Sequence, residues 1–249
     1  MARIELRDCT IYIQDGFSGS AKIATANGSA NTNTLCIGTV VTTATVNTNV
    51  PVGARFYVNG ETTNTAHTVQ TLNYSSANVV DKLLTFTPNL GAGTYNTANA
   101  SNNAITFLPC KIEVKIGEGN LTWSEKKEYV YLLDRGNLDT VKEGNEVPVE
   151  MSCEFVYEHV TTGTSEDITP VDALKKTANT ANWVSSATDQ CEPYAVDIII
   201  LHDAPCGTTQ DETITFTDFR YESLDFDLSA ATIAVSGKCN VSEAGAARS

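Results

Sequence analysis

Residues 147–158 read Val-Pro-Val-Glu-Met-Ser-Cys-Glu-Phe-Val-Tyr-Glu, so apolar and polar side chains alternate along them. The positions expected to face a core are Val147, Val149, Met151, Cys153, Phe155 and Tyr157, and those expected on the other side are Glu150, Ser152, Glu154 and Glu158. Val156 is the only break. Because successive side chains of a strand point to opposite faces of a sheet, the pattern predicts a long strand with one buried and one acidic face.

The same alternation continues on both sides of this strand. It recurs at 112–116, 194–201, 214–216 and 224–228, and a last short strand is expected over 232–236. Many strands with this period predict a mainly β chain, built as a sandwich or barrel.

A single helix is expected at about 170–186. Thr169 can cap its N-terminus, and Pro170 suits the first helical position. Apolar residues then recur every three to four positions, at Leu174, Ala178, Ala181 and Val184. One helix in a mostly strand protein usually covers a sheet face or a barrel end.

Charge is distributed unevenly along the 249 residues, whose formal net charge is −14. The segment from Thr10 to Cys110 carries three bases and three acids, whereas 111–249 carries 11 bases and 25 acids. A neutral, Thr- and Asn-rich block is therefore inserted into an acidic protein. Such a charge argues against wrapping nucleic acid, because no basic cluster is present to neutralise phosphates.

The neutral block has its own strand pattern. Short β-rich segments are expected at 35–46, 54–59, 66–74, 82–87 and 104–108, separated by turn residues. Strands at this spacing are typical of a small β-barrel. The domain boundaries predicted from this are a discontinuous outer domain at 1–16 and 110–249, a flexible connector at 17–34, and an inserted small β domain at 35–108.

Neither a catalytic nor a cofactor site emerges from the sequence. There is no phosphate-binding glycine loop, no metalloprotease motif and no calcium loop. Cys191, His202 and Cys206 contain zinc-ligand residue types, but their spacing matches no usual zinc pattern. We therefore expect no enzyme activity, no metal and no cofactor.

The N-terminus and the cysteines bear on where the protein is found. The first residues lack the apolar run of a signal peptide, and no stretch is apolar enough to span a bilayer. The seven cysteines are therefore expected to be mostly reduced. No membrane association is expected.

Acidic residues accumulate between Asp134 and Glu158, which leaves two interpretations. In an ordinary monomer, Glu150, Glu154 and Glu158 would form the solvated face of an antiparallel strand. The density of acids in one segment, against only Arg135 and Lys142, favours a role for that face.

Five segments carry a resemblance to a known family. They are Val114-Lys-Ile-Gly-Glu-Gly-Asn-Leu-Thr-Trp123, the stretch from Leu133 to Ser152, Cys191-Glu-Pro-Tyr-Ala-Val-Asp197, Phe216-Thr-Asp-Phe-Arg220 and Ala234-Val-Ser-Gly-Lys-Cys239. In order and spacing, this set resembles the major tail tube protein of long-tailed bacteriophages. The resemblance covers about 2–15 and 111–249. Between these parts, 50–60, 67–69 and 84–90 are similar to small β-barrel modules inserted into phage structural proteins.

The resemblance implies a tail-tube-like β-sandwich or barrel with one helix, plus the inserted barrel. Subunits would form hexameric rings whose inner strands join into one barrel, and the rings would stack into a tube. Implied partners are other copies of the chain and tail proteins such as the tape measure and terminator. Genomic DNA would pass without specific binding. The protein would assemble in the bacterial host cytoplasm and reside in the virion tail.

Two groups of site residues follow from the resemblance. Glu150, Glu154 and Glu158 are the candidates for lining the tube, where carboxylates would repel phosphates. A polar loop over 133–147 is expected to contact the next ring, through Asp134, Arg135, Leu138, Asp139, Val141 and Glu143. The alternative functions are a surface or adhesin-like binding module that uses the inserted domain, and a capsid or decoration protein.

Overall fold

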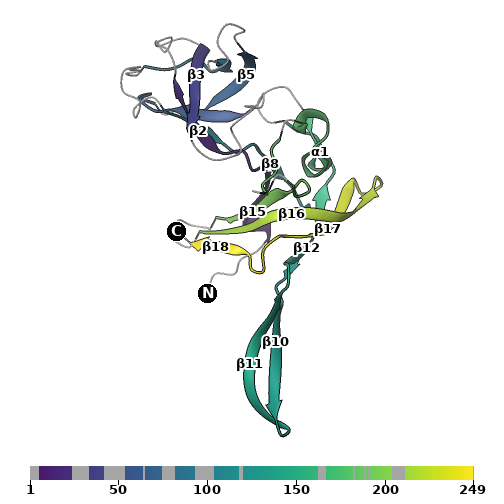
Figure 1. Cartoon of the computed structure of the whole chain (residues 1–249). Helices are drawn as coiled ribbons and strands as arrows, with labels where there is room; N and C mark the ends of the chain where they lie inside the picture. Colours follow the sequence, from purple (N-terminus) through teal and green to yellow (C-terminus); the bar gives the residue numbers. More distant parts are fainter. Residues whose placement is uncertain are drawn as a thin grey trace. The chain divides into compact units, whose positions relative to one another are not determined.

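The computed structural model describes residues 6–23, 34–41, 54–63, 65–74, 82–92, 104–117, 120–161, 167–181, 183–187, 189, 191–203 and 211–248 (Figure 1). The chain divides into two compact units. The sheet unit comprises Met1–Gln14, Lys111–Asn179 and Glu192–Ser249, and the barrel unit comprises Asp15–Cys110 and Thr180–Cys191. The sequence assigned the segment Thr180–Cys191 to the outer domain, whereas the structure gives it to the barrel unit.

The sheet unit is built on one antiparallel sheet with the strand order β8-β1-β15-β16-β17-β12-β9, to which β18 adds alongside β16. A short 3₁₀ turn, Leu6–Asp8, precedes it. Its strands are β1 (Cys9–Gln14), β8 (Lys111–Val114), β9 (Leu121–Ser124), β12 (Glu150–Val156), β15 (Val196–His202), β16 (Glu212–Asp227), β17 (Thr232–Lys238) and β18 (Gly245–Arg248). The mainly β class predicted from the alternation is confirmed, and the arrangement is consistent with a sandwich. A separate two-stranded pairing joins β13 (Val160–Thr161) to β14 (Asp167–Ile168).

Strand β16 belongs to both halves of the sheet. Its first half pairs with β15 as far as Phe219, and its second half pairs with β17 from Arg220 onwards. At the changeover Asp218 has φ 56°, and its backbone N–H donates to the Asp197 carboxylate over 3.0 Å. A left-handed residue with a bonded amide re-aims a strand without leaving an unpaired donor.

The strand at the centre of the sequence prediction is shorter than expected. Val149, Met151, Cys153 and Phe155 are buried, as the alternation predicted. The prediction for Tyr157 was wrong: β12 ends at Val156, and the Tyr157 side chain is 38% exposed. It instead stacks edge-on against Phe226, with ring centroids 6.0 Å apart.

The helix α1 spans only Pro170–Lys175, so the predicted end near 186 was wrong. Thr169 and Asp172 form a reciprocal capping box at its start. Lys176 adopts the left-handed conformation that ends the helix, and a 3₁₀ turn, Ala178–Thr180, follows. Beyond this turn, Val184 packs against the interior of the barrel unit and not along the helix.

In the barrel unit six strands pair around a closed barrel in the order β2-β3-β6-β5-β4-β7. They are β2 (Gly19–Ile23), β3 (Thr34–Val41), β4 (Arg55–Val58), β5 (His67–Tyr74), β6 (Lys82–Thr87) and β7 (Ala104–Leu108). Five of them match the expected strands, although 42–46 lie outside the described residues. The sixth, β2, was predicted to be connector, because Gly-Ser-Ala-Lys-Ile has little apolar alternation; its pairing with β3 and β7 makes it a strand.

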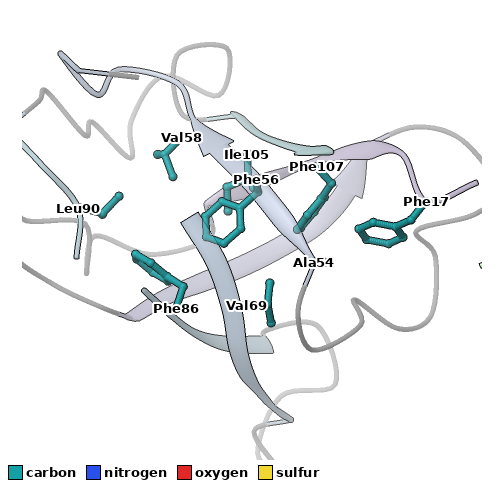
Figure 2. Packing of buried hydrophobic residues seen from close by; sticks show 9 residues of the cluster. All are labelled: Phe17, Ala54, Phe56, Val58, Val69, Phe86, Leu90, Ile105 and Phe107. Carbon is teal, nitrogen blue, oxygen red and sulfur yellow. The ribbon is translucent and has the colours of Figure 1, made fainter. Parts of the chain in front are cut away.

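The barrel interior is closely packed with aromatic side chains. Figure 2 shows nine buried residues that converge from the strands and their connections: Phe17, Ala54, Phe56, Val58, Val69, Phe86, Leu90, Ile105 and Phe107. Phe56 contacts both Phe86 and Phe107, at centroid separations of 5.3 and 5.9 Å. Aromatic clusters of this kind stabilise a fold because they bury a large apolar area and because edge-to-face ring contacts are favourable.

Candidate interaction surface

The segment expected to be a polar loop over 133–147 is a long β-hairpin, so that prediction was wrong in its structure. Strand β10 (Lys127–Asp134) pairs with β11 (Asn137–Glu146) through the two-residue turn Arg135-Gly136. Both turn residues have positive φ, 50° and 87°. This is the geometry of a type I′ turn, whose twist matches that of the flanking strands. The hairpin extends away from the sheet of its unit (Figure 1).

One face of the hairpin is apolar and open to solvent. The register places Tyr129, Tyr131, Leu133, Leu138 and Val141 on this face, with exposures between 48% and 72%, and Glu143 beside Tyr129 at its base. We call it the apolar hairpin face. Solvent-facing apolar clusters of this kind are uncommon in monomers, so this face is a candidate interaction site.

The opposite face of the hairpin is mixed. Val130 lies opposite Lys142, Leu132 lies opposite Thr140, and Asp134 lies opposite Asn137. Polar side chains therefore lie next to Val130 and Leu132 on this face. The two faces of the hairpin thus differ in polarity, which is not expected of a solvated polar loop.

Within the described chain, the hairpin strands pair only with each other. Polar contacts anchor its base, where Lys127 pairs with Glu243 and Lys126 donates to Glu150 over 2.7 Å. An isolated two-stranded hairpin is marginally stable in water. Packing of the apolar hairpin face against another molecule would supply the missing stabilisation.

The predicted contact residues occupy different parts of the hairpin. Leu138 and Val141 lie on the apolar hairpin face, Arg135 is in the turn, and Asp134 is in the last pair before it. Asp139 sits in an irregularity of the register, and Glu143 lies opposite Tyr129. Sequence reasoning missed Tyr129, Tyr131 and Leu133, although their spacing of two residues was a readable strand signal.

A second surface is the polar face of strands β12, β17 and β16. One row across it joins Glu150, Lys238 and Arg220, and the next joins Ser152, Ser236 and Ser223. The hydroxyls of Ser223 and Ser236 lie 2.8 Å apart, which confirms that these side chains share a face.

Two of the three predicted wall carboxylates have lysine partners. Glu150 pairs with Lys126 at 2.7 Å, and Glu158 pairs with Lys115 at 2.9 Å. The hydrogen bond from Lys126 and its charge lower the pKa of Glu150, which remains ionised but locally compensated. Glu158 lies beyond the end of β12, so it does not extend the strand's polar face as the sequence predicted.

The remaining acidic side chains of this face form a compact group. Glu154, Ala234 and Asp225 make a row across the three strands, and Asp227 ends the next row. None of the ion pairs between described residues includes Glu154 or Asp225. Hydrogen bonds from Ser229 and Ala230 lower the pKa of Asp227. Sequence reasoning missed both aspartates because they lie in a different strand.

No cluster of potential metal ligands occurs among the described residues. Cys191 is exposed, His202 is buried, and Cys206 lies outside the described residues. Of the helices that the structure describes, none has the length and apolar character to span a lipid bilayer.

Comparison with protein families, with curated proteins and with solved structures gives no match to this chain. The resemblance to tail tube proteins therefore depends on the residues quoted above.

Proposed function

We propose that this protein is a structural subunit that assembles with copies of itself into a phage tail tube. The observation that carries the proposal is the apolar hairpin face, which no described part of the same chain covers. A protein that exposes such a surface on a projecting hairpin is built to bury it against another molecule.

The sheet unit offers edges through which copies can join. In the series β9-β12-β17-β16, strand β9 is one edge, and the Arg220–Asp227 half of β16 is the other. Among described strands, each of these pairs on one side only. Pairing β9 of one copy with β16 of the next would be a head-to-tail contact, which forms a ring when the rotation closes. It would also remove the free edges that otherwise invite aggregation.

The polar face of this four-strand series supports a lining role. If the series forms the inner wall of a ring, Glu154, Asp225 and Asp227 would repeat around the bore. A confined wall with this charge raises a negative potential that repels DNA phosphates. The charge-compensated Glu150 row would contribute less to that potential.

The proposed contact is tested by a matched pair of double variants. Tyr131→Ser with Leu133→Ser removes two side chains of the apolar hairpin face. Val130→Ser with Leu132→Ser removes two exposed apolar side chains of the same strand, on the opposite face. Both pairs lower the β propensity of β10 to a similar degree.

Purified proteins are then compared by sedimentation velocity and negative-stain electron microscopy. The parent chain is expected to form rings or tubes, the Tyr131 and Leu133 variant is expected to remain unassembled, and the control is expected to assemble. A parent chain that stays monomeric at all concentrations, or equal assembly of the two variants, contradicts the proposal.

A further inference from the structure

The barrel unit contains a buried acid–base pair that the proposed function does not use. The side chains of Glu61 and His67 are fully buried, and His67 Nε2 lies 2.9 Å from Glu61 Oε2. Glu61 lies in the connection after β4, and His67 begins β5. Charged side chains are rarely buried unless they are paired and hydrogen-bonded. The hydrogen-bond partners of each atom therefore indicate which of the two side chains carries the proton.

The two imidazole nitrogens both face oxygen acceptors. Nδ1 lies 2.8 Å from the carbonyl oxygen of Pro88, and Nε2 faces the Glu61 carboxylate. A backbone carbonyl can only accept, so Nδ1 must carry a proton. A neutral imidazole has a single N–H, so it would then place a bare Nε2 against a carboxylate oxygen.

The Glu61 carboxylate also has backbone donors. Gly91 N–H donates to Oε1 over 2.6 Å, and Thr65 N–H donates to Oε2 over 3.2 Å. Hydrogen bonds from amides favour the ionised carboxylate. The proton therefore belongs on the imidazole, with both ring N–H groups donating.

We propose that His67 is a buried imidazolium whose ion pair with Glu61 locks one end of the barrel. The ion pair ties the connection between β4 and β5 to the segment after β6, since Glu61 and His67 bind Gly91 and Pro88. A backbone bond from Thr62 N–H to the carbonyl of Ala92, 2.9 Å long, joins the same two segments.

Aromatic rings pack against the imidazole. The rings of Phe56 and Phe86 flank the imidazole, at centroid separations of 5.4 and 5.1 Å. None of the ion pairs between described residues brings a third charge to either group. A ring with a single N–H would leave Nδ1 or Nε2 as an acceptor that faces another acceptor, within a pair whose side chains are fully buried.

The first test is nitrogen-15 NMR of the full chain labelled at histidine, performed by magic-angle spinning so that assembly does not interfere. The His67 ring is identified by its cross-peaks to Phe56 and Phe86. The expected result is that both ring nitrogens carry protons at pH 7.5. A ring with one unprotonated nitrogen at that pH overturns the proposal.

The second test uses Glu61→Gln, which can keep the contacts without the charge. The introduced side-chain amide can donate to neutral Nε2 while its oxygen accepts from Gly91. In the same NMR measurement at pH 7.5, the variant's His67 ring is expected to show Nε2 without a proton, whereas the parent ring shows protons on both nitrogens. The same protonation of the ring in both proteins would show that the Glu61 carboxylate does not hold the extra proton on His67.

Discussion

The carboxylate of Asp15 gives the sharpest prediction for stability. It is 1% exposed, and among the described residues three backbone N–H groups of the barrel unit donate to it. Oδ1 accepts from Phe17 at 3.2 Å and from Cys110 at 2.8 Å, and Oδ2 accepts from Val184 at 3.2 Å. These donors lie at the first strand connection, at the end of the insert, and in the distant segment 180–191. One side chain thus holds three separate parts of the chain together.

The variant Asp15→Asn replaces one of these oxygens with an amino group. In its best orientation the amide oxygen takes the place of Oδ1, so the amino group faces the N–H of Val184. A buried donor without an acceptor costs about 1–3 kcal/mol. The other two bonds change from charged to neutral and lose about half their strength. Relief of the buried charge offsets part of this, so the expected loss is about 2–3 kcal/mol.

Tryptophan fluorescence can follow the barrel unit alone. Trp183 belongs to that unit and is 5% exposed, whereas the other tryptophan, Trp123, belongs to the sheet unit. In a Trp123→Phe background, urea unfolding monitored at Trp183 reports the barrel unit. With a slope of about 1.5 kcal/mol/M, the variant's midpoint should fall by about 1.3–2 M.

A matched substitution controls for the general effect of losing a carboxylate. Asp189→Asn changes an exposed residue of the same unit that accepts one bond, from the Cys191 N–H at 2.9 Å. Its midpoint should shift by less than about 0.3 M, since such surface changes usually cost under 0.5 kcal/mol. If Asp15→Asn and Asp189→Asn have the same midpoint, the proposed role of the buried carboxylate is wrong.

Two further predictions concern the buried thiols and the wall charge of the sheet unit. Burial raises the pKa of Cys153 and of Cys239 to about 12, whereas Cys191 is exposed. At pH 8, iodoacetamide should therefore label Cys191 in the native chain, and it should label Cys153 and Cys239 only after denaturation. Peptide mass spectrometry measures the labelling. The same raised pKa values imply that the folded chain loses stability as pH rises above about 9, where the thiols of the unfolded chain ionise. Rapid labelling of Cys153 in the native chain would contradict both the labelling prediction and this pH dependence. Reversing the wall charge with Glu154→Lys and Asp225→Lys should make assembled tubes retain duplex DNA at low salt, with retention that falls as salt rises, whereas the Gln and Asn versions should retain little. Tubes with the reversed charge that retain no DNA would remove the electrostatic argument for the wall.

The alternation of side chains predicted much of the strand content correctly. Period two is a local property, so the strands at 54–59, 66–74, 82–87 and 104–108 were found within a residue or so of their observed ends. The buried face of β12 was predicted for the same reason. Among the candidate contact residues, Leu138 and Val141 are exposed apolar side chains, and they lie on a strand where a loop was expected.

Features that depend on partners distant in sequence were missed. The composition of 133–147 is polar, and only its pairing with β10 reveals a hairpin with one apolar face. The lysine partners of Glu150 and Glu158 come from other strands or their connections, so the charge of the predicted wall could not be judged from β12 alone.

The sequence by itself determined the class of the fold and the existence of a neutral insert, because strand period and local charge are written in neighbouring residues. Only the tertiary structure decided where each segment belongs. The helical spacing through Val184 is interrupted because Lys176 turns left-handed and the barrel unit takes up 180–191. Likewise, Gly19–Ile23 becomes a strand because closing the barrel requires its hydrogen bonds, and Asp15 is buried because three distant amides converge on its carboxylate.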